Sequence, residues 1–149
     1  EPGFPGEGAF REVSPDRIVS AASLCSASMV KLVAHHPHHA VDALFAQVET
    51  CLGAAASVTH SGASFVEVAA PGVSKSAGLA TLCRRLGIAP AQVVAFGDMP
   101  NDVMMLRLAG HGVAVANAHA EVLAAADEVT ASNDDDGVAM VIERLLAAV

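Results

Sequence analysis

The feature that most constrains the fold is a regular alternation of short apolar segments and helical patterns, which begins at Pro71-Gly72 and continues to the end of the chain. The pattern predicts strands at 93–96, 113–116 and 128–131 and helices at 76–86, 103–109, 120–126 and 138–148. Such alternation builds a parallel sheet with right-handed crossovers. We therefore expect residues 72–149 to form a doubly wound α/β lobe that binds ligands at the carboxyl ends of its strands.

The segment before this lobe has a different predicted order of strands and helices. The first 71 residues predict a strand at 29–34, a helix at 40–52 that Gly53 ends, and a hairpin of two strands at 57–60 and 64–68. A weaker signal at Ser14-Pro15-Asp16 predicts a short helix through about residue 24. We expect two parts, 1–71 and 72–149, the first with the order β-α-β-β.

Composition narrows the class of protein. The chain has 149 residues, of which 53% are hydrophobic, and no apolar run reaches the roughly 18 residues that a membrane span needs. A net charge of −8 disfavours nucleic acid and anionic membranes as partners. The three cysteines, Cys25, Cys51 and Cys83, form no metal-binding or disulfide pattern, which favours reduced thiols and a cytoplasmic location. The chain lacks an initial methionine and is interpreted as a fragment.

Acidic and amide side chains follow the predicted strand at 93–96. Gly97 allows a sharp turn, so the carboxylate of Asp98 is expected at the edge of the sheet. Asn101 and Asp102 follow within one turn, and such a density of oxygen ligands favours magnesium. Two structural alternatives remain open: Asp102 could cap the helix at Val103, and Asp98 could cap a turn.

Lys75 strengthens the functional interpretation. It lies at the start of a predicted helix, where a positive charge is unfavourable unless an anion binds nearby. A phosphate group would satisfy that requirement. The alternative is a solvated surface lysine beside a Ser74 cap.

Several segments, taken in order, closely resemble the Cof-type branch (subclass IIB) of the haloacid dehalogenase (HAD) superfamily. They are Gly72-Val73-Ser74-Lys75, Leu86-Gly87-Ile88, Val94-Ala95-Phe96-Gly97-Asp98-Met99-Pro100-Asn101-Asp102, Gly112-Val113-Ala114-Val115-Ala116-Asn117-Ala118, and Ala125-Ala126-Asp127-Glu128-Val129-Thr130 before Ser132-Asn133-Asp134. The resemblance covers about the last 80 residues. It implies a HAD-like Rossmannoid half-core at 72–149, and residues 1–71 are compatible with the end of that branch's inserted α+β (type C2) cap.

The resemblance also implies an activity, namely a magnesium-dependent phosphatase of sugar phosphates or other small phosphate esters. Lys75 resembles the lysine that stabilises the phosphate, and Asp98 the direct magnesium ligand. Asp102 resembles the acidic residue that holds a metal-bound water. Asn101 resembles an amide that orients the substrate or the lysine.

One part of the family pattern is missing. HAD phosphatases begin with a strand that ends in Asp-x-Asp-Gly-Thr, whose first aspartate attacks phosphorus to form an aspartyl phosphate. No such motif precedes Lys75, so we expect the chain alone to be inactive and to need the missing amino-terminal part of its protein. The motif is mimicked by the segment Asp134-Asp135-Asp136-Gly137-Val138. This segment directly precedes the last helix, where the helix dipole favours acidic residues. The alternative to an enzyme is a non-catalytic module that binds phosphate or metal.

Other polar residues carry weaker signals. His35-His36-Pro37-His38-His39 could bind metal, but adjacent histidines rarely converge on one ion, so a polar loop is favoured and a role in specificity stays open. His60 and Ser64 have the same ambiguity. Met99, Met104 and Met105 are expected to pack. Asn133 and Asp134 are expected to cap the last helix rather than contact the water shell of magnesium.

Overall fold

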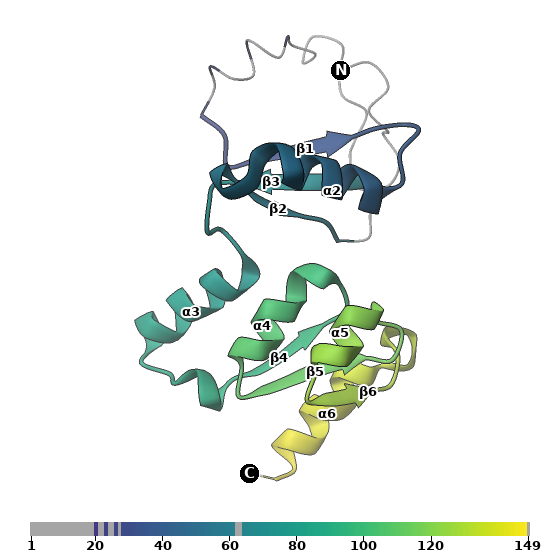
Figure 1. Ribbon diagram of the computed structural model, residues 1–149. Helices are drawn as coiled ribbons and strands as arrows, with labels where there is room; N and C mark the ends of the chain where they lie inside the picture. Colours follow the sequence, from purple (N-terminus) through teal and green to yellow (C-terminus); the bar gives the residue numbers. More distant parts are fainter. Residues whose placement is uncertain (1–19, 21–22, 24–25, 27, 62–63, 149) are drawn as a thin grey trace. The chain divides into compact units, whose positions relative to one another are not determined.

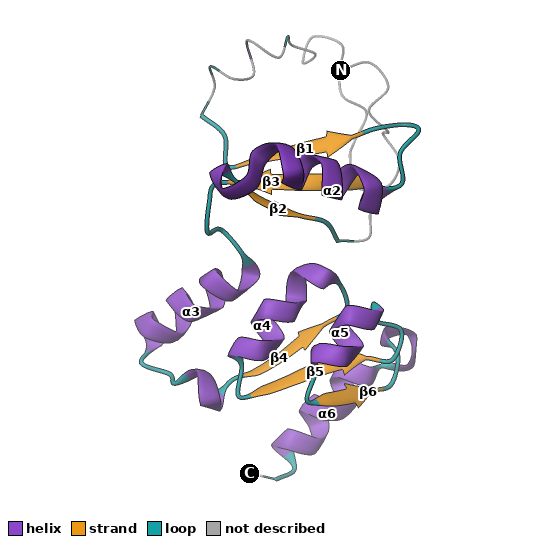
Figure 2. Ribbon diagram, in the orientation of Figure 1, coloured by secondary structure: helices purple, strands orange, loops and turns teal. Residues whose placement is uncertain are grey.

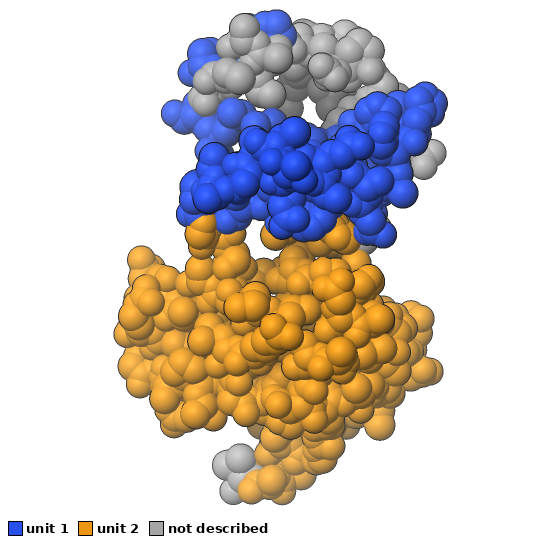
Figure 3. Space-filling model, in the orientation of Figure 1, with its two compact units in different colours: residues 1–58, 63–71 blue, residues 59–62, 72–149 orange. Residues whose placement is uncertain are grey.

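A computed structural model of the chain describes residues 20, 23, 26, 28–61 and 64–148. The chain divides into two compact units: residues 1–58 and 63–71 belong to the first, and residues 59–62 and 72–149 to the second (Figure 3). No helix in the described residues is long and apolar enough to cross a membrane. All but residues 20 and 23 of the short helix predicted from residue 14 to about residue 24 lie outside the described residues.

The first unit contains the predicted β-α-β-β order (Figure 1). Its elements are β1 (Lys31–His35), α2 (Val41–Leu52), β2 (Ser57–Thr59) and β3 (Phe65–Ala69), of which only Thr59 is counted with the second unit. The sheet order is β1-β3-β2, and β1 runs antiparallel to β3 from Lys31 opposite Ala69 to His35 opposite Phe65. Gly53 ends α2 with a φ of 48°, a backbone conformation that favours glycine.

The second unit contains the predicted parallel sheet with its helices (Figure 2). Its elements are α3 (Lys75–Leu86), β4 (Val94–Gly97), α4 (Val103–Leu108), β5 (His111–Val115), α5 (Ala120–Ala125), β6 (Glu128–Thr130) and α6 (Gly137–Leu146). The strands pair in the order β4-β5-β6, all parallel. In Figures 1 and 2, α4 and α5 lie on one face of the sheet and α6 on the other, while α3 lies beside α4.

Small and branched side chains fill the space between the sheet and its helices. Ala95 and Ala114 of the strands pack with Leu106 of α4 and Val122 of α5, and Met105 joins them as predicted. Side chains alternate along a strand, so Val113 points to the opposite face, which α6 covers. Both faces of β5 are therefore buried. By contrast, the exposed fraction of Met104 is 60%, so its expected packing role is wrong.

The strand β5 begins at His111, two residues before the predicted start. Long-range pairing explains the difference, because His111 lies opposite Val94 in the register of β4 and β5. The next residue, Gly112, donates its N–H to Asp127 Oδ2 at 2.7 Å. These partners lie far away in the sequence, so the local pattern around His111 does not contain them.

A histidine, a glutamate and an arginine join the amino-terminal ends of β5 and β6 to α6. Glu128 Oε2 lies 2.9 Å from His111 Nε2, and Arg144 donates to both Glu128 oxygens at 2.7 and 2.8 Å. The hydrogen bonds from Arg144 and His111 lower the pKa of the Glu128 carboxyl below its ordinary value of 4.5. The folded state therefore binds this proton less readily than the unfolded chain, so the cluster stabilises the fold above about pH 4.5 and less so as pH falls through the lowered pKa.

We expect Glu128→Gln to lower the Tm at pH 7 and to weaken the decrease in Tm between pH 7 and pH 3. The neutral amide keeps the shape of the side chain but loses the charge that Arg144 contacts. Thermal unfolding followed by circular dichroism across this pH range measures both effects. Glu143→Gln is the control, because Glu143 is exposed on α6 and forms no ion pair in the described residues. Parallel Tm curves for Glu128→Gln and the unchanged protein would contradict this prediction.

Candidate active site

The carboxylate of Asp98 lies at the carboxyl edge of the parallel sheet. Strand β4 ends at buried Gly97, and Asp98 follows at once with an exposed side chain. The backbone carbonyl of Asp98 accepts a hydrogen bond from the N–H of His119 at 2.8 Å, which fixes the loop against the start of α5. Among the described residues, the Asp98 carboxylate itself has no hydrogen-bond partner. It is therefore available to a ligand.

Asp102 organises the turn that follows Asp98. Its side chain is almost fully buried, and its Oδ2 accepts hydrogen bonds from the backbone N–H groups of Asp98 and Met99, each at 3.1 Å. The carboxylate therefore points back toward the strand. At the start of α4 its side chain makes no capping hydrogen bond, so the capping alternative for Asp102 is wrong.

Lys75 reaches the same carboxylate from the first residue of α3. Its Nζ donates to Asp102 Oδ1 at 2.5 Å. The preceding residue, Ser74, accepts a hydrogen bond from the N–H of Ala77 at 3.1 Å and caps the helix, as predicted. One buried carboxylate thus accepts hydrogen bonds from an ammonium group and from two backbone amides. Through Asp102, segments 27 residues apart in the sequence meet at one site.

Asn101 contributes an oxygen with no partner. The Oδ1 atom of Asn101 is buried and accepts no hydrogen bond in the described part of the chain. A buried acceptor without a donor costs free energy, so such atoms are often explained by an ion, a water or a ligand. The carboxylate of Asp98 fits a magnesium ion, which uses one or two carboxylates and completes its coordination with water and phosphate.

The described residues contain no group of three or more His, Cys, Asp or Glu side chains arranged to hold a metal.

Two asparagines join the next loops along the same edge. Asn117, after β5, donates through its side-chain amide to Asn133 Oδ1, and the N–H of Asn133 donates to Asn117 Oδ1 at 3.1 Å. The expected helix cap by Asn133 is therefore wrong, because Asp136 occupies the N-cap position of α6 and makes no side-chain capping bond. Sequence reasoning missed the role of Asn117. Its place directly after a buried strand was the available signal, as it was for Asp98.

The segment that mimics the nucleophile motif lies after β6. Residues 133–135 form a short 3-10 helix, and Ser132 Oγ donates to Asp135 Oδ2 at 2.8 Å. Because β5 separates β4 from β6 in the sheet, this loop is two strands away from the strand that carries Asp98.

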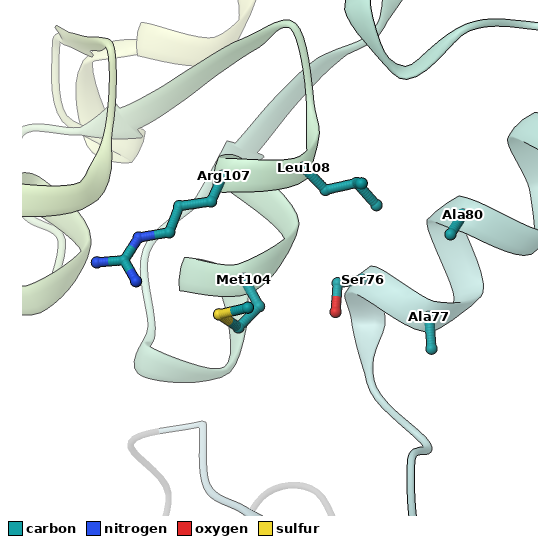
Figure 4. A pocket seen from close by; sticks show the side chains of 6 residues that line it. All are labelled: Ser76, Ala77, Ala80, Met104, Arg107 and Leu108. Carbon is teal, nitrogen blue, oxygen red and sulfur yellow. The ribbon is translucent and has the colours of Figure 1, made fainter.

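A shallow hollow lies between α3 and α4, with a volume of about 410 Å³ (Figure 4). Ser76, Ala77 and Ala80 line it from α3, and Met104, Arg107 and Leu108 line it from α4. Figure 4 shows Ser76 and Met104 facing each other across the hollow, while the guanidinium of Arg107 points away from α3. The helix that begins with Lys75 thus borders a loosely filled space on its α4 side.

Gly97 must lack a side chain for this site to form. A Cβ atom at Gly97 would lie 2.6 Å from the Cβ of Asp102. We expect Gly97→Ala to lower the free energy of unfolding by about 1–3 kcal/mol and to displace the Asp102 carboxylate. Urea unfolding measures the first effect, and the amide NMR shifts of Asp98 and Met99 report the second.

Gly78→Ala is the control for this substitution. Gly78 lies inside α3, and a Cβ atom there would meet nothing within 4 Å. We expect this variant to be more stable by about 0.5–1 kcal/mol, because alanine favours the helix. An unchanged free energy of unfolding in Gly97→Ala would contradict the steric argument.

Comparisons with known proteins identify the family of this chain. The model of a family described as haloacid dehalogenase-like hydrolase matches residues 13–142. A relative named 5-amino-6-(5-phospho-D-ribitylamino)uracil phosphatase YcsE, from Bacillus subtilis, is 42% identical over 57% of this chain and 34% of its own length. Another relative, from Arabidopsis thaliana, is named endoribonuclease YBEY, chloroplastic, and is 41% identical over 62% of this chain and only 16% of its own length.

A solved structure shares the fold as well. The HAD subclass IIB sugar phosphatase BT4131 matches with a TM-score of 0.75 and 28% identity, over 85% of this chain and 47% of its own. The chain thus spans about half of this protein and less of the two curated relatives. The family match covers most of the sequence, includes the whole turn from Asp98 to Asp102, and agrees with the parallel sheet. The chain belongs to the haloacid dehalogenase-like hydrolase family.

Proposed function

We propose that the protein is a Mg²⁺-dependent phosphatase that hydrolyses small phosphate monoesters, sugar phosphates among them. The observation that carries the proposal is the position of Asp102. Its buried carboxylate binds Lys75 through one oxygen and the amides of Asp98 and Met99 through the other. This arrangement joins an ammonium group to the loop that presents a free carboxylate, and a dianionic phosphate needs charges of this kind around it.

Each residue has a distinct role in the proposal. The side chain of Lys75 is 48% exposed, so it can bind phosphate oxygens while Asp102 fixes its direction. Asp98 would hold the magnesium ion directly, and Asp102 would hold one of the waters bound to that ion. Asn101 would orient the substrate or the lysine through the oxygen that has no partner in the described residues. When bound, magnesium supplies positive charge that offsets the charge of the phosphate.

The attacking aspartate belongs, in this proposal, to a segment that the sequence does not contain. No Asp-x-Asp-Gly-Thr motif precedes Lys75, and the chain covers 47% of the sugar phosphatase it resembles. The phosphoryl group would pass to that aspartate and then to water. Residues 72–149 would supply the second half of the core domain, and residues 1–71 the end of the cap. The names of the phosphatase relatives support the small phosphorylated substrate.

The test is hydrolysis of p-nitrophenyl phosphate and of a panel of sugar phosphates, with and without Mg²⁺. The chain would be assayed alone and joined to the amino-terminal segment that this proposal requires. We expect Mg²⁺-dependent release of phosphate from the joined protein only. Hydrolysis by the chain alone would contradict a missing nucleophile. It would favour residues 134–138 as the source of the nucleophile.

The alternative function is a module that binds phosphate or metal without catalysis, which the absent nucleophile motif favours. It predicts that the joined protein binds inorganic phosphate in the presence of Mg²⁺ but releases none from any ester. Phosphorus NMR of added phosphate, measured on the same samples, distinguishes binding from turnover.

A further inference from the structure

Two histidines meet at a tight turn between β1 and α2. Residues 36–39 form a four-residue turn in which the N–H of His39 donates to the carbonyl of His36 at 3.4 Å. Pro37 occupies the second position, where its fixed φ favours such a turn. The first and fourth residues of a turn lie within about 7 Å of each other, so the backbone places these two imidazoles side by side.

Their ring nitrogens converge. The Nδ1 atoms of His36 and His39 are 2.6 Å apart, and the ring centroids are 4.1 Å apart with nearly perpendicular planes. Adjacent histidines were not expected to share an ion, but these two are three residues apart. The neighbouring imidazoles make other contacts. His35 Nδ1 bonds to the carbonyl of Ser64 at 2.6 Å, and the centroid of the His38 ring lies 6.0 Å from that of the His36 ring.

The hydrogen bonds define which atom carries the lone pair. The backbone N–H of His38 donates to His36 Nδ1 at 3.2 Å, so that nitrogen is an acceptor, and His39 Nδ1 must then donate to it. The His36 imidazole is therefore neutral in this arrangement, because its Nδ1 carries no proton. Neutral imidazole is the form that binds metals.

We propose that His36 and His39 form a surface site for a first-row divalent transition metal of the Zn²⁺ or Cu²⁺ class. Both rings would bind through Nδ1 once His39 carries its proton on Nε2 and the N–H of His38 no longer donates to His36 Nδ1. Ligand nitrogens about 2.0–2.1 Å from a tetrahedral ion lie about 3.3 Å apart, so the rings need to separate by less than 1 Å. Imidazole nitrogen selects such ions over Mg²⁺, which binds oxygen, so this site differs in chemistry from the one at Asp98.

The ion would keep at least two waters. The described residues contain no group of three or more potential ligand side chains, and both histidines are exposed. With only two protein ligands, the affinity for the ion depends on how rigidly the turn holds the two imidazoles in place. Loosening the turn should weaken binding even with both histidines present.

The test is isothermal titration of Zn²⁺ into the full chain with excess Mg²⁺. All variants would carry Cys51→Ser, because Cys51 is an exposed free thiol. We expect His36→Gln and His39→Gln each to lower the Zn²⁺ affinity at least about tenfold. Pro37→Gly should lower it by a smaller factor. His38→Gln is the matched control from the same turn and should keep the affinity.

Imidazole NMR provides an independent readout. Zn²⁺ should shift the Nδ1 resonances of His36 and His39, whereas Mg²⁺ alone should leave both in place. The proposal is overturned if Zn²⁺ leaves these resonances unchanged, if both glutamine variants keep the original affinity, or if His38→Gln loses as much as they do.

Discussion

Replacing Lys75 with alanine is expected to lower phosphatase turnover in the complete enzyme by about 10²–10³-fold, while the protein stays folded. The ammonium group would neutralise charge that grows on the phosphoryl oxygens, and a methyl group offers nothing in its place. The protein should stay folded because the buried Asp102 carboxylate keeps its hydrogen bonds from the N–H groups of Asp98 and Met99. Steady-state kinetics with p-nitrophenyl phosphate and thermal unfolding measure the two quantities.

Lys31→Ala is a closely matched control. Lys31 is also 48% exposed and donates to a carboxylate, Glu67, at 2.6 Å. It belongs to the first compact unit and is not part of the proposed site. We expect turnover to be unchanged in this variant. An equal loss in both variants would mean that any exposed ion pair matters, and retained turnover in Lys75→Ala would contradict the role of Lys75.

Asp98→Ala should have a comparable effect on turnover for a different reason. Its exposed carboxylate has no hydrogen-bond partner among the described residues, so its removal should cost little stability. The loss should instead appear as weaker binding of Mg²⁺, measured by titrating the ion into the assay. A variant that keeps its turnover and its Mg²⁺ dependence would contradict the assignment of Asp98.

Asp102→Ala is the second large effect, and here folding and activity should both decrease. The substitution leaves the amides of Asp98 and Met99 without their acceptor at a partly buried turn, and each such loss costs about 1–3 kcal/mol. It also frees Lys75. We expect the free energy of unfolding to decrease by about 2–4 kcal/mol in urea titrations, with turnover almost lost.

Asp102→Asn separates the two effects. The amide oxygen can still accept from both backbone N–H groups, whereas the amide nitrogen would face the Lys75 ammonium and cannot bind it. Most of the stability should remain while turnover falls about as far as in Lys75→Ala. If Asp102→Asn keeps full turnover, the fixed direction of the ammonium group is unnecessary and the proposed role of Asp102 is wrong.

Local pattern was sufficient to predict most of the fold. Short apolar segments and capping residues define β4 and α4 to within one residue, because the signals lie within a few positions of each element. The start of β5 was placed too late, since His111 joins the strand only by pairing with Val94 across the sheet. A short window of sequence does not contain information on contacts between residues this far apart in the chain.

The candidate site was also predictable only in part. The position of Asp98 follows from its place after a strand, and the family resemblance assigned Lys75 to the same site. The direction of the Asp102 carboxylate could not be predicted, because capping α4 and accepting from the preceding loop are equally compatible with the sequence. The pair formed by His36 and His39 was missed because the prediction considered adjacent residues, whereas the Pro37 turn joins the first residue to the fourth.

The packing of α3 has a consequence for the chemistry. This helix lies against α4 and borders the hollow that Ala80 and Leu108 help to line. The packing of α3 on α4 therefore helps to set the direction of Lys75, the first residue of α3. A bulkier side chain at Ala80 would project into that hollow and change how α3 packs on α4. The catalytic rate of such a variant would therefore test whether the fit between two helices fixes the ammonium group, at a point where no charge is altered.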